Sequence, residues 1–428
     1  MKVEVKKISR GQAEINIELS VEEFQPFLSL AAAHISEHHK IPGFRPGKAS
    51  LEVVKQHIPE DEIWEEALQP AVQKTFLAVL DQEKLITVGS PKIEVIKLAP
   101  GNPVIYKATI SLLPQVKLGD YKQIKIKAKP AVVSDKQTNE LLTNLQKRRA
   151  KETLVTRPAA KGDKVEIDFE AFIDRIPVEH GKQENFPLVL GEGSFIPGFE
   201  DNLVGAKAGE TKEFQLNFPD NYYQKNLAGK LADFKVNVRS IFSLDLPELN
   251  DEFAKGVGQF QTLAELKKQL VDNLQQEATL KEEQRVEEEL IEKLISVSSF
   301  DDIPDLLIDN ETEKMFQELE QNLSAQGVQM PDYLMHLKKS KEDFLLELVP
   351  TAIKRVKGAL VTREVGQAKQ VTITDQELEQ EVKKTLELYP NNKEIAKQIN
   401  TPEYGNYLKN ILSARKVINH LKDVMVEK

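Results

Sequence analysis

Apolar and polar residues alternate in four short runs near the start of the chain: residues 3–8, 13–19, 92–98 and 104–113. Alternation with a period of two is typical of strands that bury one face, so these runs predict a β-sheet. Between the second and third runs, apolar residues recur at a helical spacing instead. Residues 1–116 are therefore predicted to form an α+β unit.

Two helices are predicted inside this unit. Ser20 and Glu23 have the spacing of a capping box, which marks the start of the first helix. Its apolar face is formed by residues spaced three or four apart: Phe24, Leu28, Ala31 and Ile35. A loop is expected at residues 41–48, and a second helical region at residues 60–84.

The rest of the chain divides into three segments. Residues 117–150 are polar and end in a helical stretch, which predicts a connector. Residues 151–245 carry strand patterns punctuated by glycine and proline, which predicts a compact β-rich domain. Residues 246–428 show interrupted apolar stripes between long charged faces, which predicts an all-α domain with extended helical arms. The expected fold class is α+β multidomain.

Composition and charge exclude several kinds of protein and of site. The chain has 428 residues, 40% hydrophobic and 29% charged, enough for more than one core and a well-solvated surface. Its net charge of −10 disfavours an extended nucleic-acid surface, although a small basic site stays open. The absence of cysteine excludes disulfides and cysteine nucleophiles. A charged N-terminus and no apolar run of about 18 residues predict a cytoplasmic protein.

One hexapeptide combines an aromatic ring and two cations in a predicted turn: Gly43, Phe44, Arg45, Pro46, Gly47 and Lys48. A Pro-Gly pair favours a tight reversal that points the larger side chains outward. Arginine and lysine can grip phosphates, and an exposed phenylalanine adds an apolar contact. For a lone hexapeptide, an ordinary surface turn is the simpler interpretation.

After a capped helix and at this distance from the start, the hexapeptide resembles the ribosome-docking loop of bacterial trigger factors. The resemblance implies that Phe44, Arg45 and Lys48 contact RNA and protein of the large ribosomal subunit at the exit of the peptide tunnel. Gly43, Pro46 and Gly47 would shape the loop.

A second group of aromatic residues lies at the ends of predicted strands in the β-rich segment. Strand aromatics usually form core, but residues 196–200 (IPGFE) resemble a motif of FKBP-type prolyl isomerases, which trigger factors carry in their middle. The resemblance implies a pocket formed by six residues: Phe169, Phe186, Ile196, Phe199, Tyr222 and Phe234.

Such a pocket suits rotation about an X-Pro peptide bond, which faces a barrier of about 18–20 kcal/mol. The twisted transition state has lost amide resonance and carries less charge separation, so an apolar, desolvated site binds it better than the planar ground state. The hydroxyl of Tyr222 would orient the substrate backbone. This chemistry needs no nucleophile, metal or cofactor, and none is expected.

Two positions in the loop around residues 176–181 depart from the family pattern. Val178 occupies a place where trigger factors and their relatives commonly have an aromatic residue. Glu179 occupies one where stand-alone isomerases have aspartate. The departures leave the strength of the isomerase activity open.

Residues 34–38 match the H-x-x-E-H pattern of inverted zinc peptidases. His34 and His38 would share one helical face, as zinc binding requires. A five-residue motif arises easily by chance in an acidic chain, so a solvated helix face beside the docking loop is the favoured interpretation and no metal site is predicted.

The C-terminal helices carry no catalytic motif and could be a structural scaffold. The resemblance instead implies a chaperone cradle, in which apolar residues scattered among charges bind unfolded chains weakly. The candidates are Phe253, Phe260, Met315, Phe316, Tyr333, Leu334, Phe344 and Tyr404.

Taken over the whole chain, the resemblance implies a ribosome-associated chaperone that keeps nascent chains open, isomerises X-Pro bonds and dimerises off the ribosome. In this family the connector forms one body with the C-terminal helices. Two alternatives stay open. One is an enzyme whose helices only position the isomerase domain, and the other is a holdase whose pocket has decayed.

Overall fold

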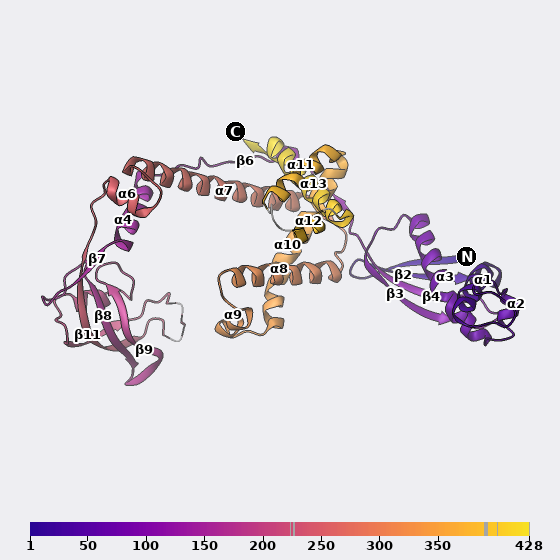
Figure 1. Cartoon of the computed structure of the whole chain (residues 1–428), viewed down its shortest axis with the longest axis horizontal. Coiled ribbons are helices and arrows are strands. Elements are labelled where there is room, and N and C mark those ends of the chain that lie inside the picture. The colour runs from indigo at the N-terminus through magenta and orange to yellow at the C-terminus, as the bar shows by residue number, and fades with distance from the viewer. Residues whose placement is uncertain (223, 226, 389–392, 400, 428) are drawn as a thin grey trace. The chain divides into compact units, whose positions relative to one another are not determined.

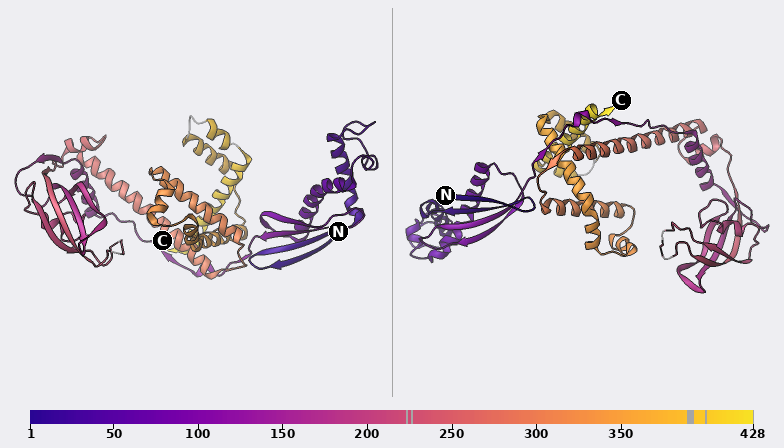
Figure 2. Two further views of the ribbon diagram at one scale, coloured as in Figure 1. Left: turned by 90° about the horizontal axis from the view of Figure 1, so that it is seen from below. Right: turned by 180° about the vertical axis from the view of Figure 1, so that it is seen from behind.

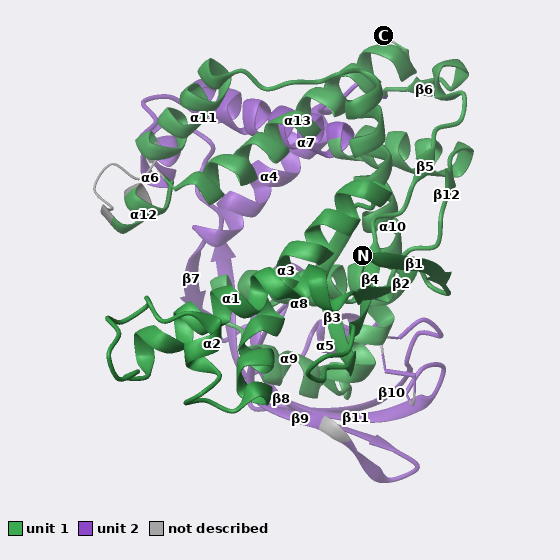
Figure 3. Cartoon of the chain, turned by 90° about the vertical axis from the view of Figure 1, so that its right-hand side faces the viewer, with its two compact units in different colours: residues 1–128, 284–428 green, residues 129–283 purple. Residues whose placement is uncertain are grey.

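A computed structural model describes residues 1–222, 224–225, 227–388, 393–399 and 401–427. The chain divides into two compact units, coloured separately in Figure 3: residues 1–128 with 284–428, and residues 129–283. Within the described ranges, no helix is long and apolar enough to cross a membrane. The predicted fold class is confirmed, because strands and helices mix at the start, strands dominate the middle and helices the end.

The N-terminal part of the first unit is a four-stranded antiparallel sheet with helices packed on it (Figure 1). The strand order is β1 (Lys2–Ile8), β2 (Gln12–Leu19), β4 (Val104–Leu112) and β3 (Thr87–Lys97). The helices are α1 (Val21–His38), α2 (Leu51–Val54) and α3 (Glu60–Glu83). Alternate residues of β2 are buried, and they pack in one core with Phe24 of α1 and Trp64 of α3.

The sequence predicted these elements well. The capping box is present, since Glu23 N–H donates to the Ser20 hydroxyl and Ser20 N–H donates to the Glu23 carboxylate. β3 begins at Thr87, before the predicted residue 92, because a bulge between Val88 and Lys92 breaks the alternation in the sequence.

A five-stranded antiparallel sheet forms the centre of the second unit. Its strands are β7 (Lys151–Leu154), β8 (Lys164–Ile173), β9 (Ile176–Val189), β10 (Thr211–Asn217) and β11 (Leu231–Asp245). The order is β10-β11-β8-β9, and β7 pairs with β11. Alternate residues of β8 and β11 are buried on one face, where the short helix α5 (Phe199–Leu203) packs.

Strand β9 differs from the prediction, because it includes residues 176–181, where a loop was expected. Glu170 of β8 pairs with Lys182, whereas Phe172 pairs with Pro177, so residues 178–181 bulge out of the ladder. The turn before β9 has two residues with positive φ, 52° and 66°. Such turns are usually marked by Asn-Gly, and here the sequence is Asp-Arg.

Three helices complete the second unit: α4 (Asp135–Arg148), α6 (Asp251–Val257) and the first part of α7 (Leu263–Val297). They meet in a separate apolar cluster formed by Leu142, Phe253, Ala254 and Leu266. From residue 284, α7 belongs to the first unit.

The C-terminal part of the first unit is helical. Besides the end of α7, its helices are α8 (Asp305–Ala325), α9 (Met330–Leu337), α10 (Lys341–Ala368), α11 (Asp375–Leu388), α12 (Lys393–Ile399) and α13 (Pro402–Met425). α8 and α10 pack against each other, as the orange helices of Figure 2 show. Pro304 directly precedes α8.

The core of this helical part also includes the segment that follows the N-terminal sheet. That segment contains β5 (Val116–Lys117), a 3₁₀ turn at Tyr121–Gln123 and β6 (Ile126–Lys127). β5 pairs with β12 (Ser299–Phe300), and β6 pairs with β13 (Val426–Glu427). The shared core includes Val116, Tyr121, Ile126, Leu290, Val361 and Leu421.

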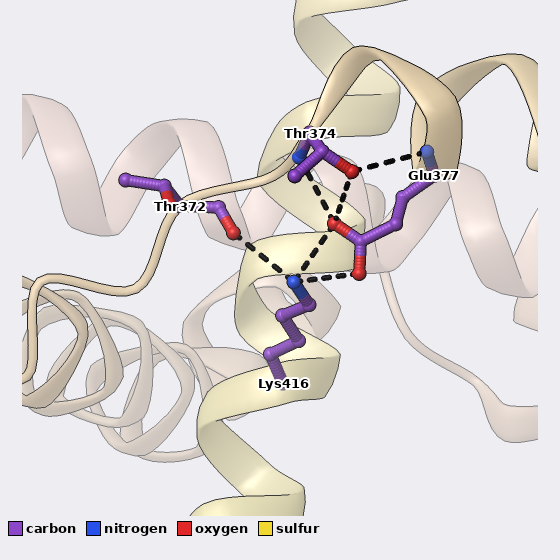
Figure 4. Close-up of polar contacts among 4 residues, drawn as sticks. All are labelled: Thr372, Thr374, Glu377 and Lys416. Atoms are coloured by element: carbon purple, nitrogen blue, oxygen red, sulfur yellow. Dashed lines mark hydrogen bonds and ion pairs between the residues drawn. The ribbon is translucent and has the colours of Figure 1, made fainter.

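An ion pair between Glu377 of α11 and Lys416 of α13 joins the two helices (Figure 4). A capping box opens α11, since Thr374 N–H donates to the Glu377 carboxylate and Glu377 N–H donates to the Thr374 hydroxyl. Lys416 Nζ lies 2.7 Å from Glu377 Oε1 and donates to the carbonyl of Thr372 at 3.1 Å. Hydrogen bonds from Lys416 and then from Thr374 lower the pKa of Glu377 from 4.5 to about 2.

We expect Glu377→Gln to loosen α11 at neutral pH, because the variant loses the ion pair with Lys416. The folded pKa lies below the usual one, so the stabilisation is complete above about pH 5 and is lost as the pH falls toward about 2. Hydrogen exchange of the α11 amides in parent and variant checks this. The difference between the two should shrink as the pH falls.

The matched control is Glu379→Gln, because Glu379 is exposed on the same helix and has no ion pair among the described residues. A difference between the Glu377 variant and the parent that stays constant with pH would contradict the assignment.

Candidate functional sites

Two consecutive turns build the loop between Ile41 and Ala49, whose side chains are buried in the N-terminal core. In the turns at 41–44 and 45–48, the N–H of the last residue donates to the carbonyl of the first, at 3.3 and 3.1 Å. Each turn has proline second and glycine third, and the glycines have φ of 82° and 73°. These are features of type II turns, which need glycine at the third position.

Between the buried anchors, Phe44, Arg45 and Lys48 are exposed or partly exposed. The Phe44 side chain is 46% exposed, which is unusual for phenylalanine. In the described part of the chain, neither cation has an ion pair. The turns therefore present one aromatic ring and two uncompensated positive charges to solvent.

The histidines of the H-x-x-E-H pattern are neighbours on α1, with ring centroids 4.8 Å apart. His34 Nδ1 lies 2.7 Å from Glu66 Oε1 of α3, and the Glu37 side chain lies against Gly47 of the exposed loop. Among the residues that the structure describes, no three His, Asp or Glu side chains are placed to hold a metal. This geometry gives the peptidase alternative no support.

The aromatic residues of the second unit form one cluster around Phe199. Its ring centroid lies 6.1 Å from that of Phe169 and 5.4 Å from that of Phe234. Phe169 contacts Phe186 edge-on at 5.7 Å, and Ile196 is buried in the same cluster. The structure thus brings five of the six predicted pocket residues together.

The sixth residue, Tyr222, lies at the edge of the cluster. Its ring centroid is 4.7 Å from that of Phe218, and Phe218 is 6.0 Å from Phe234. Tyr222 is partly buried against the same core.

Three further aromatic residues were missing from the predicted pocket: Phe195, Phe214 and Phe218. The ring centroid of Phe195 lies 4.0 Å from that of Phe199, closer than that of either Phe169 or Phe234. Its position directly before the motif at 196–200 was the signal that could have found it. Phe214 lies opposite Phe234 in the β10–β11 pair. Alternation in the sequence predicts that Phe214 faces inward, but not that it contacts this cluster.

Exposure divides the cluster into a floor and a rim. The floor is almost fully buried: Phe199 is 0% exposed, Phe234 2%, Phe169 8% and Ile196 8%. The rim residues Phe186, Phe195 and Tyr222 are only partly buried. An aromatic floor with an accessible apolar rim can desolvate a bound peptide segment.

Asp168 fixes the strand beside Phe186. Its carboxylate accepts hydrogen bonds from Asn185 N–H at 2.9 Å and from Arg239 Nε at 2.5 Å. Asn185 has a φ of 54°, which asparagine tolerates better than most residues. Burial acts to raise the pKa of Asp168, but the donors Arg239 and Asn185 outweigh it and lower the pKa. The carboxylate is therefore charged at neutral pH.

Val178 lies in the bulge of β9 and packs against the aromatic cluster. A cavity of about 160 Å³ lies beside it, lined by Glu170, Ala171, Phe172, Pro177, Val178, Gly181 and Lys182. These lining residues belong to β8 and β9, and none of the six predicted pocket residues is among them. The side chain of Glu179, the other departure from the family pattern, lies outside the described residues.

Family models match nearly the whole chain in three pieces. Residues 1–145 match the model of bacterial trigger factor protein, residues 155–242 that of FKBP-type peptidyl-prolyl cis-trans isomerase, and residues 262–423 that of the trigger factor C-terminus.

Curated relatives agree with these matches. The trigger factor of Caldicellulosiruptor saccharolyticus is 31% identical, over 98% of this chain and 96% of its own length. That of Carboxydothermus hydrogenoformans is 34% identical, over 93% of both chains. A solved trigger factor structure, from work on promiscuous substrate recognition in folding and assembly, is 24% identical, with a TM-score of 0.48 over 99% of this chain and 100% of that one.

The burial of Phe199 predicts a structural cost for its loss. We expect Phe199→Ala to destabilise the second unit by about 3–5 kcal/mol, because a large buried ring leaves a cavity. Phe186→Ala should cost clearly less, because the Phe186 ring is partly exposed. The single tryptophan, Trp64, lies in the other unit, so hydrogen exchange of the β8 and β11 amides is the suitable measurement. Equal costs for both variants would contradict the division into floor and rim.

Proposed function

The chain belongs to the trigger factor family, the ribosome-associated chaperones that carry a peptidyl-prolyl isomerase domain, and we propose how its parts divide this work. Residues 1–116 dock on the ribosome, and residues 151–245 isomerise X-Pro bonds. Residues 246–428 hold unfolded chains, joined by the connector at 117–150. The core that Val116, Tyr121 and Ile126 share with the C-terminal helices supports this role for the first part of the connector.

The loop at residues 43–48 is proposed to contact RNA and protein of the large subunit at the tunnel exit. The observation that carries this is the pair of proline-glycine turns between buried anchors, which present Phe44, Arg45 and Lys48 together. A ring and two charges held on a rigid turn lose little conformational freedom on binding. The site is small, which is compatible with a chain whose net charge is −10.

The aromatic cluster of the second unit is proposed as the isomerase pocket, with Phe169, Ile196, Phe199 and Phe234 as its floor and Phe186 and Tyr222 on its rim. The cluster offers apolar surface formed by aromatic and aliphatic side chains, which suits a transition state with reduced charge separation. Catalysis then depends on shape and desolvation. No cofactor or metal takes part.

The exposed fractions of the apolar side chains indicate which residues of the C-terminal helices could contact clients. Phe253, Phe316 and Phe344 are buried, so they support the helices from inside and are not client contacts. Met335 of α9 and Leu346 of α10 are 72% and 69% exposed, beside the buried cluster that contains Phe316 and Phe344. Isolated apolar side chains among charges suit weak, reversible binding of nascent chains, which would keep them open at the tunnel exit.

The remaining parts of the proposal follow from the family. The chain works in the cytoplasm, partly bound to ribosomes, and forms a homodimer when it is free. An enzyme without client binding and a holdase without turnover are the two competing functions. Measuring proline-peptide turnover and aggregation suppression on one sample separates them from the proposed function.

Replacement of Phe44, Arg45 and Lys48 by alanine should abolish co-sedimentation with ribosomes and leave isomerase turnover unchanged. Binding by the parent should weaken as salt rises, because phosphate contacts release counterions. Replacement of Lys55 by alanine is the control, since Lys55 lies in the same part of the chain but is paired with Glu60. Full ribosome binding by the triple variant would refute the docking assignment.

Val178→Phe should raise turnover of a proline peptide, because Val178 packs against the aromatic cluster and a larger apolar side chain there would desolvate the twisted bond better. Phe186→Ala should lower turnover, because it removes apolar surface from the rim. Val178→Ile, which adds a single methylene, is a control with little expected gain. A folded Val178→Phe protein with unchanged turnover would show that this residue does not form the pocket wall.

Replacement of both Met335 and Leu346 by lysine should weaken suppression of aggregation of an unfolded protein, because the exposed apolar contacts are lost. The control adds the same charge without removing apolar surface, by replacing Gln326 and Gln329, which are exposed in the same region, with lysine. Equal suppression by the two double variants would place client binding elsewhere.

A further inference from the structure

A buried carboxylate adjoins the floor of the proposed pocket in the chain. Glu200 is 8% exposed and follows Phe199 in α5. Its Oε2 atom accepts hydrogen bonds from the N–H groups of Gly191 and Gly193, at 2.7 and 3.0 Å. Its Oε1 atom accepts from those of Ser194 and Phe195, at 2.7 and 3.4 Å. One side chain thus satisfies four backbone donors of a single loop.

The backbone of the loop at 191–195 is shaped around this carboxylate. Gly191 and Gly193 have φ of 94° and 69°, which L side chains rarely adopt. Such conformations allow successive N–H groups to point toward one centre, as in the concave anion sites formed by backbone amides. The centre here is a side chain of the same domain, so the loop is folded on Glu200.

The carboxylate is ionised at neutral pH. Burial acts to raise the pKa of Glu200, but the N–H groups of Gly193, Gly191, Ser194 and Phe195 outweigh it and lower the pKa. A neutral side chain at position 200 would bind the loop more weakly, because backbone donors bind a charged acceptor about twice as strongly as a neutral one.

The loop ends at the rim of the pocket. Phe195 is the last residue held by Glu200, and its ring lies 4.0 Å from Phe199 and 5.2 Å from Phe169. Ile196, in the floor, comes next. The carboxylate therefore holds the backbone of Phe195, whose ring lies against the floor.

Building on the proposed isomerase pocket, we propose that Glu200 is a positioning residue for prolyl isomerisation. Its buried carboxylate holds the loop at 191–195, so that Phe195 forms a preorganised rim. A peptide then binds a rim that is already ordered. Without the carboxylate, each binding event must order the loop, which weakens binding of the substrate more than it slows the rotation of substrate already bound.

The test uses the full chain, a short proline peptide as substrate and the variant Glu200→Gln. We expect KM to rise about ten-fold with kcat within about two-fold of the parent, because the cost of ordering a few backbone bonds falls on the binding step. The amides of residues 191–195 should exchange hydrogen at least about ten-fold faster, since they lose their charged acceptor.

A matched control lies in the same loop. Glu192 is also a carboxylate but faces outward, 2.7 Å from Lys147, with both side chains partly exposed. Glu192→Gln should leave KM, kcat and the loop amides unchanged, because an exposed ion pair contributes little. Glu200→Asp keeps the charge but ends one methylene short, so its KM should rise less than that of Glu200→Gln. If Glu200→Gln fails to fold, the KM of Glu200→Asp tests the proposal instead.

Unchanged KM in a folded Glu200→Gln or Glu200→Asp protein would overturn the proposal, as would a fall in kcat at constant KM. Phe186→Ala separates this outcome from a failure of the pocket assignment. If Phe186→Ala lowers turnover while the Glu200 variants behave like the parent, only the positioning role is wrong. If none of them affects turnover, the pocket itself has been misplaced.

Discussion

The packing of the Phe199 ring is the contact on which the middle domain and its proposed site both depend. The ring joins the short helix α5 to three strands, through Phe169 of β8, Phe214 of β10 and Phe234 of β11. The next residue, Glu200, turns back to bind the loop at 191–195. Two adjacent residues therefore fix the floor by apolar packing and the rim by backbone hydrogen bonds, so the pocket cannot form unless α5 is seated on the sheet.

Strong periodicity explains why much of the fold was predictable from the sequence. The alternation in β2 and the apolar face of α1 each match a buried face, because a single side of each element meets the core. Strand β9 lacked such a signal, since its bulge at 178–181 breaks the alternation and its Asp-Arg turn is an uncommon one.

The residues of the proposed pocket were predicted from family resemblance. Their division into floor and rim was not, because a pattern shows which way a strand residue faces but not what covers it. Glu200 ends the motif at 196–200, but it is one of 68 acidic residues, and no sequence pattern marks the four N–H groups around it.

The two proposed sites are built alike. In each, glycines with positive φ shape a short loop, and buried neighbours hold it: Ile41 and Ala49 for the docking loop, Ile196 and Glu200 for the rim loop. They differ in what they present. The docking loop turns its ring and charges outward, toward a partner. The rim loop turns its N–H groups inward, toward Glu200, and leaves an aromatic ring at the surface. In both cases rigidity comes from local backbone geometry, which reduces the entropy lost on binding.

Val178 places a small side chain against the aromatic cluster, where the family commonly has an aromatic residue. A pocket that works by shape and desolvation loses efficiency gradually when one wall recedes, because no proton transfer or covalent step depends on a single group. If the C-terminal helices hold clients as proposed, a bound client is also tethered to the isomerase domain through the same chain. Its prolines then meet the pocket as an intramolecular event, for which effective concentrations reach the millimolar range with short flexible links. Weak affinity for a free peptide is therefore compatible with useful turnover on a held client. Tethering does not replace the proposed positioning role of Glu200. A loop that must be ordered at each encounter weakens binding of free and tethered clients alike.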